Sequence, residues 1–188
     1  MATSPFENQI QNRNFLSQIG FKFTLAKEPK VAFMCNSARI PEITLGVAKQ
    51  PTYLKMIDVP GEILTYGDLT LKFLIDENME NYMAVHNWLT GLGFPETTQQ
   101  YKNLTTNDDE IRDSKEAFSD GSLHILNSNG RDIAIVKFKD LFPVSLSSLE
   151  FDATPTDVMY LTALVTFKYT IYDILGTDNK PLYPFTST

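Results

Sequence analysis

The longest regular pattern in the sequence is an alternation of side chains over residues 158–174, VMYLTALVTFKYTIYDI. Alternation with a period of two is typical of a β-strand, whose successive side chains point to opposite faces. A strand this long exceeds the usual length. We therefore expect it either to bend across two sheets or to protrude and pair with another subunit. One predicted face carries Met159, Leu161, Ala163, Val165, Phe167, Tyr169 and Ile171.

Shorter runs indicate further strands. Residues 19–25 and 68–76 alternate, and residues 31–40 are expected to pair with 19–25. Asn129-Gly130 predicts the turn of a β-hairpin, and residues 139–157 read as an irregular excursion. About seven strands and one helix favour a mainly β fold, a β-sandwich or barrel with one flanking α-helix and long inter-subunit loops.

The 188 residues suit one domain. Four parts of it are expected to lie outside the packed body, namely a flexible arm over 1–14, an extended loop over 41–67, an acidic insertion over 95–120 and a loose tail over 176–188. Residues 107–120 hold six acidic and two basic side chains, a net charge of -4 out of -7 for the whole chain. An acidic chain disfavours a nucleic-acid-binding surface, which would be basic.

The segment DENMENYMAVHNWL, residues 76–89, predicts a helix that closes the sheet. Asn78 is the expected N-cap, and Gly91, Gly93 and Pro95 are expected to end the helix. Trp88 and Leu89 are expected to anchor it to the sheet. One stripe at helical spacing holds Met79, Tyr82, Met83, His86 and Leu89, or Trp88 in place of Leu89.

Catalytic and metal-binding patterns are missing from the sequence. His86 and His124 are its only histidines, and neither lies in a known nucleophile motif. The single cysteine, Cys35, lies in an apolar run and reads as a small buried hydrophobe. We therefore expect no enzyme, no cofactor and no metal. The sequence also lacks a signal peptide and a membrane-spanning run, so we expect cytoplasmic synthesis and no membrane anchoring.

The predicted loop over 41–67 is long and carries many apolar residues. Loops of this length in a compact domain are usually functional, and a surface loop of a monomer has no reason to be so apolar. We predict that it contacts other subunits. The candidate contact residues are Ile43, Leu45, Tyr53, Leu54, Met56 and Ile63.

An ordered series of segments resembles the tail tube proteins of contractile-tailed bacteriophages. The segments are FKFTL, FMCNSARIPEI, DVPGEILTYGDLTLKFLIDENMENYMAVHNWL and VKFKDLFPVSLSSLEFD, followed by the long C-terminal strand. The resemblance covers about residues 15–175 and implies a virion structural protein, similar in fold to the type VI secretion tube protein. Its subunits form hexameric rings that stack into a hollow tube inside a contractile sheath, and the tube conducts the genome into the host.

The resemblance also implies partners: further copies of the chain, the tail sheath protein, a tape measure protein in the lumen, and baseplate and tail terminator proteins. DNA would pass through without specific binding. Because like charges repel, a lumen that lets DNA slide should be neutral or acidic. The candidate lumen residues are the loop carboxylates Asp58, Glu62 and Asp68. Two alternatives stay open, a baseplate-proximal tube initiator of the same family and a ligand-binding β-barrel.

Overall fold

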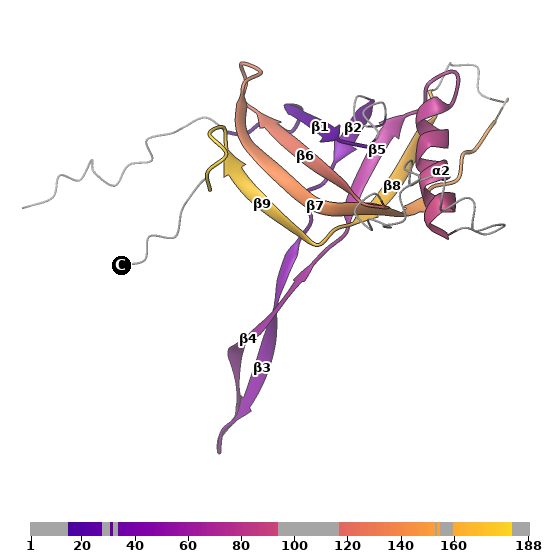
Figure 1. Cartoon of the computed structure of the whole chain (residues 1–188). Coiled ribbons are helices and arrows are strands. Elements are labelled where there is room, and N and C mark those ends of the chain that lie inside the picture. The colour runs from indigo at the N-terminus through magenta and orange to yellow at the C-terminus, as the bar shows by residue number, and fades with distance from the viewer. Residues whose placement is uncertain are drawn as a thin grey trace, which may run out of the picture.

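A computed structural model describes residues 15–27, 31, 34–93, 117–152, 154 and 160–181. The predicted arm over 1–14 and residues 95–116 of the acidic insertion lie outside this part of the chain. Figure 1 shows a curved β-body with one helix on its side and a long hairpin that projects from it. The elements are β1 (Phe21–Leu25), β2 (Cys35–Ala38), β3 (Ile43–Pro51), β4 (Met56–Tyr66), β5 (Leu69–Leu74), α2 (Glu80–Gly93), β6 (Ser119–Leu126), β7 (Asp132–Leu146), β8 (Thr162–Lys168) and β9 (Ile171–Gly176).

Seven strands form the body, in the order β1-β6-β7-β8-β5-β2, with β9 paired to β7. All pairs are antiparallel. The mainly β fold with one flanking helix is therefore confirmed. Within the described residues β1 and β2 are the two ends of this order and are not paired, so the sheet curves without closing into a barrel.

Strand β7 is the central strand of the sheet and pairs with β6, β8 and β9. Its first part, Ala134–Lys139, pairs with β9, and its last part, Phe142–Leu146, pairs with β8. Between them Asp140 has a φ of 56°, and the β6–β7 register shifts at the same point. Such irregularities bend a strand, and this one lets β7 pass from one half of the body to the other.

The C-terminal alternation forms two strands, not one. β8 and β9 both lie along β7 but are separated at Tyr169 and Thr170. Neither predicted option holds in full, because the run does not bend as one strand but breaks into two strands that pair with different parts of β7 in one sheet. Ala163, Val165 and Phe167, which share one predicted face, are buried. Beyond the break the inward face changes, because Tyr172 packs against the core and Ile171 is exposed.

Three sequence-based boundaries differ from the structure. Residues 139–146 belong to β7 instead of an irregular excursion, and Pro143 fits within a strand because the register shifts beside it. Ser119 and Asp120 belong to β6, so the insertion ends before them. The tail does not become loose at 176, because Gly176 ends β9 and its N–H donates to the carbonyl of Lys180, 2.8 Å away.

One strand pairing was also wrong. β2 pairs with β5 and not with the neighbouring β1, which pairs with β6. Ile19 precedes β1 and is 89% exposed, so the core face of this strand starts at Phe21. The turn at Asn129-Gly130 is as predicted, and Gly130 has the positive φ of 72° that favours glycine there.

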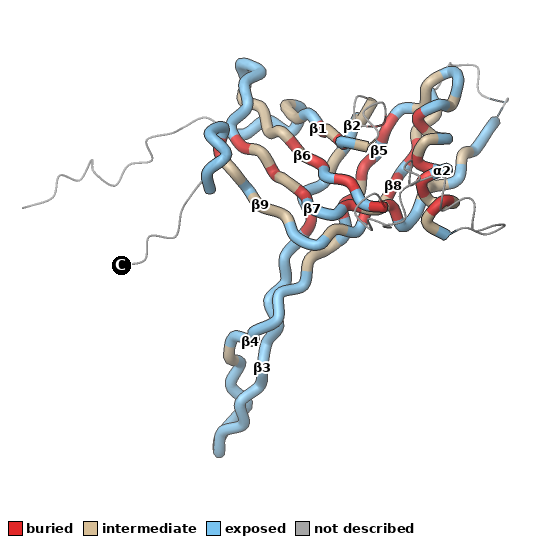
Figure 2. Tube along the Cα trace, viewed as in Figure 1, coloured by how far each residue is buried: buried red, intermediate tan, exposed pale blue. Residues whose placement is uncertain are grey.

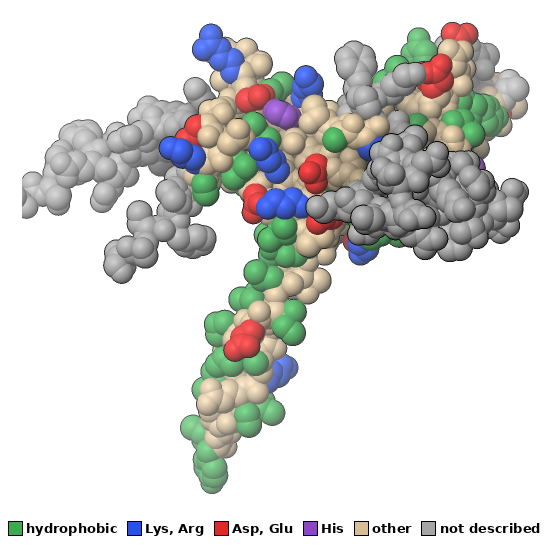
Figure 3. Space-filling view, viewed as in Figure 1, with side chains coloured by type: hydrophobic (Ala, Val, Ile, Leu, Met, Phe, Trp, Pro, Cys, Tyr) green, Lys and Arg blue, Asp and Glu red, His purple; other side chains and the backbone are tan. Residues whose placement is uncertain are grey.

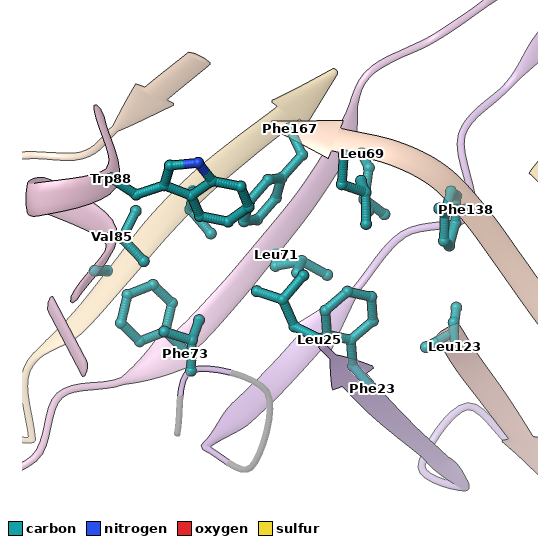
Figure 4. Close-up of a cluster of buried hydrophobic side chains, with 14 of the residues drawn as sticks. Phe23, Leu25, Leu69, Leu71, Phe73, Val85, Trp88, Leu123, Phe138 and Phe167 are labelled. Carbon is teal, nitrogen blue, oxygen red and sulfur yellow. The ribbon is translucent and has the colours of Figure 1, made fainter. Parts of the chain in front are cut away.

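Helix α2 covers one end of the core through Val85 and Trp88 (Figure 4). The Trp88 side chain is 1% exposed, tilts against Phe167 at 6.0 Å between ring centroids, and donates its indole N–H to the carbonyl of Ala117 at 3.0 Å. Leu89 is half-buried against the same core. Trp88 is therefore the main anchor of the helix, as expected.

The predicted stripe of this helix is correct only in part, since Tyr82, Leu89 and Trp88 do pack on the core, and the predicted cap was wrong. The buried positions are Asn81, Val85, Trp88 and Gly91, whereas Met83 and His86 are exposed. Asn81 is buried because its side-chain amide donates to the carbonyl of Leu74 at 2.7 Å. Asn78 does not cap the helix. Instead the carboxylate of Asp76 accepts the Asn81 backbone N–H at 3.4 Å, and Met79, with a φ of 57°, precedes the first turn.

Candidate assembly interface

Residues 43–66 form a two-stranded hairpin that stands away from the body (Figure 1). The predicted extended loop is thus regular, with β3 paired to β4 from Ile43↔Tyr66 at the root to Pro51↔Met56 near the tip. The side chain of Thr52 closes the turn by donating its hydroxyl to the carbonyl of Lys55 at 2.6 Å. The inward-facing main-chain groups of the two strands are therefore paired with each other, whereas, within the described residues, both outer edges of the hairpin stay open.

Along most of its length the hairpin packs against no other part of the chain that the structure describes (Figure 2). All nine residues of β3 are exposed, and none of the residues of β4 is buried. The apolar side chains on this arm are conspicuous in Figure 3. Tyr53 and Leu54 at the tip are 102% and 90% exposed. An isolated two-stranded hairpin is marginal in water, and exposed apolar patches mark interaction sites.

All six predicted contact residues lie on this arm and are exposed. The structure adds three that the sequence analysis missed: Val47, Ile57 and Leu64. The signal was present, because Val47 continues the alternation of Ile43 and Leu45 along β3. Whether these nine side chains touch another subunit remains a prediction.

The two strands come unusually close at one point. A Cβ atom added to Gly61 would lie 2.6 Å from the carbonyl oxygen of Gly46, whereas one added to Gly46 would meet the carbonyl oxygen of Ile63 at 3.4 Å. The register shifts here, between Leu45 and Val47. Only glycine at position 61 allows this approach, and the hairpin therefore depends on Gly61 more than on Gly46.

The three predicted lumen carboxylates do not form one cluster. Asp58 lies on β4 opposite Lys49, and Glu62 follows it four residues later. Asp68 lies past the hairpin and forms an ion pair with Lys168. A lysine beside a carboxylate offsets its charge, so Asp68 contributes little net acidity. Placement of these groups at a lumen remains a prediction.

The root of the hairpin is surrounded by tyrosines that the sequence analysis did not single out. Tyr66, the last residue of β4, makes edge-to-face contacts with Tyr169 and Tyr172, at 6.3 and 5.6 Å between ring centroids. The available sequence signal was misleading, because unbroken alternation places Tyr169 and Tyr172 on opposite faces of one strand.

The two histidines lie on different elements. His86 is exposed on α2. His124 lies on β6, with its Nδ1 atom 3.1 Å from a carboxylate oxygen of Asp132. Their lack of a catalytic role remains a prediction. No group of three histidine, cysteine or acidic side chains among the described residues could hold a metal ion.

Cys35 is half-buried, less than predicted. Burial raises the pKa of its thiol to about 11. The thiol thus stays protonated at neutral pH, and a protonated thiol is a poor nucleophile. None of the described helices is long and apolar enough to cross a membrane.

An exposed apolar hairpin on a small β-body has the geometry of an interaction surface. The chain belongs to the phage tail tube protein family, whose model matches residues 1–175. It is therefore a structural protein of the tail-tube type.

Named relatives agree with this family. The chain is 25% identical over 173 residues to the tail tube terminator protein of Enterobacteria phage T4, and the match covers 89% of each chain. Among solved structures it resembles the tube terminating cap of the anti-feeding prophage, at 16% identity with a TM-score of 0.59 over 93% of this chain and 100% of that chain. A chain of the PVC sheath–tube complex, from an extracellular contractile injection system, matches at 16% identity with a TM-score of 0.56 over 94% and 100% of the two chains.

Proposed function

We propose that this chain forms a ring that terminates the tail tube of a phage with a contractile tail. The projecting apolar hairpin carries the assembly part of this proposal, because it offers each copy an arm that can lie on the next. A head-to-tail contact of this kind closes into a ring when the rotation between copies fits. The resemblance to tail tube proteins suggests six copies.

The position at the end of the tube is supported by the T4 relative, which is a tail tube terminator and matches along most of both chains. A terminator needs one face that binds the last tube ring and another that does not bind a further copy. Its partners would be the tube, the sheath and, in the lumen, the tape measure protein. DNA would pass through the ring, and the role needs neither catalysis nor a cofactor.

A second candidate is the repeating tube ring itself. Its support is the match to a chain of the PVC sheath–tube complex, which covers all of that chain. The two candidates differ in one physical property. A repeating ring has two complementary faces and grows by stacking, whereas a terminator ring does not stack on itself.

The two candidates are distinguished by whether the assembly grows as the protein concentration rises. The purified full-length chain would be followed by light scattering and negative-stain microscopy across a range of protein concentrations. A terminator is expected to give discrete rings whose thickness does not increase. Tubes that lengthen with concentration would support the repeating ring instead. A chain that stays monomeric throughout the range would contradict both candidates.

A further inference from the structure

The corner between β8 and β9 lies at the root of the hairpin (Figure 1). The break after Lys168 and before Ile171 brings Tyr169 and Tyr172 together, with 5.9 Å between their ring centroids. Both rings also contact Tyr66. An unbroken strand would have directed these two side chains to opposite faces. The break therefore builds a compact aromatic cluster where the hairpin leaves the body.

The two tyrosine hydroxyls bind the two ends of the hairpin separately. Tyr172 donates to the carbonyl of Pro41, just before β3, at 3.1 Å. Tyr169 donates to the carbonyl of Gly67, just after β4, at 2.9 Å. The N–H of Gly67 in turn donates to the carbonyl of Glu42 at 2.9 Å and so links the two ends of the hairpin to each other. Each end of the hairpin is thus attached to the body by its own hydrogen bond.

The cluster is itself held by the core. Phe138 on β7 is 1% exposed and contacts both rings, at 5.2 Å for Tyr169 and 5.6 Å for Tyr172. The ion pair between Asp68 and Lys168 lies beside it. Burial, followed by the nearby Tyr172, Asp68 and Tyr66, raises the pKa of Tyr169 to about 12. Its hydroxyl thus keeps its proton and can donate at neutral pH.

We propose that Tyr169 and Tyr172 are positioning residues that fix the direction of the hairpin, so that each copy presents its arm ready to meet the neighbouring copy. The effect on ring assembly rests on the proposed function, whereas the attachment of the hairpin by the two tyrosines does not. The remainder of the arm is solvent-exposed on both faces, so contacts at the root decide where it points. An arm held in its bound direction loses less freedom on binding, which strengthens association.

The test removes the hydroxyls of Tyr169 and Tyr172 and keeps their aromatic rings. In a Tyr169→Phe/Tyr172→Phe chain the aromatic contacts remain, whereas the carbonyls of Pro41 and Gly67 lose their donors. The matched control is Tyr82→Phe, which removes a hydroxyl that donates to the carbonyl of Ser147 at 3.3 Å, away from the hairpin. Tyr160→Phe, at an 80% exposed position, is the surface control.

The direction of the hairpin is followed through the distance between its tip and a fixed point on the body. Spin labels would be placed on cysteines introduced at Lys55, near the hairpin tip, and at Arg131, in the β6–β7 turn, with Cys35 replaced by serine. The label-to-label distances are then recorded by pulsed electron paramagnetic resonance in dilute, spin-diluted protein. We expect a narrow distribution in the parent and in both controls, and a clearly broader one in the double variant.

Ring formation is measured on the same variants without labels. Loss of two hydrogen bonds that preorganise the arm should raise the concentration needed for ring formation about tenfold, whereas Tyr82→Phe should leave it unchanged. An unbroadened distance distribution in the double variant would overturn the proposal. Rings formed by the double variant at the parent's concentration would overturn its role in assembly. A parent that forms no ring would refute the proposed function, while the distance measurement would still decide whether the tyrosines hold the arm.

Discussion

Replacing Trp88 with alanine should destabilise the protein by about 3–5 kcal/mol, the usual cost of removing a large aromatic side chain from a core. Trp88 is almost wholly buried, packs on Phe167 and provides the link from α2 to Ala117. Because domains are stable by only about 5–15 kcal/mol, this one change should give protein that is poorly folded or insoluble. Chemical denaturation followed by circular dichroism measures the effect.

Two further substitutions on α2 make the Trp88 result specific. Trp88→Phe keeps an aromatic ring beside Phe167 but removes the indole N–H, so the carbonyl of Ala117 loses its partner. Its expected cost is smaller, about 1–3 kcal/mol. Met83→Ala changes a side chain that is 43% exposed on the same helix and should stay within about 0.5 kcal/mol of the parent. If Trp88→Ala were as stable as Met83→Ala, α2 would not be anchored through Trp88.

Shortening the hairpin should abolish assembly without unfolding the body. Residues 48–59 would be replaced by Asn-Gly, a two-residue turn that joins the paired positions Val47 and Pro60. No buried core residue lies between positions 43 and 66, so the thermal unfolding of the body should change little. Burying a large apolar side chain contributes about 1.5–3 kcal/mol. Loss of Tyr53 and Leu54 alone should therefore raise the concentration for ring formation more than about a hundredfold.

A pair of single substitutions tests the same arm with less disruption. Gly61→Ala places a Cβ atom 2.6 Å from the carbonyl oxygen of Gly46 and forces the two strands apart. Gly46→Ala, on the facing strand, meets its nearest neighbour at 3.4 Å and should assemble like the parent. Size-exclusion chromatography with light scattering reports the assembly state. Rings formed by the shortened chain, or equal behaviour of the two alanine variants, would show that the hairpin is not the contact.

Alternation of apolar and polar residues was enough to locate most of the strands. It grouped Leu69, Leu71 and Phe73 on one face of β5, and these residues are buried because that face lies on the core. The apolar arm was marked by its composition instead, because so many apolar residues outside a regular core strand have no use in a monomer. Local patterns of this kind depend only on neighbouring residues, which the sequence shows directly.

Features that depend on distant contacts were missed. The break at Tyr169 and Thr170 has no glycine or proline to mark it, and it becomes evident only from the partners of the two tyrosines. Asn81 is polar yet buried, because a backbone carbonyl on β5 accepts from its amide. Pro143 suggested a strand end but lies within β7, where a register shift accommodates it. In each case tertiary contacts, not local preference, decide the outcome.

The position of the chain in an intact tail tests the central claim most directly. A cryo-EM reconstruction of the phage tail, carried from one end to the other, would show which rings are built from this chain. The body and the projecting hairpin make its fold recognisable in density. We predict a single ring of this chain at one end of the tube, with each hairpin lying on the neighbouring copy. Finding this chain in every ring along the tube, or in none, would contradict the account.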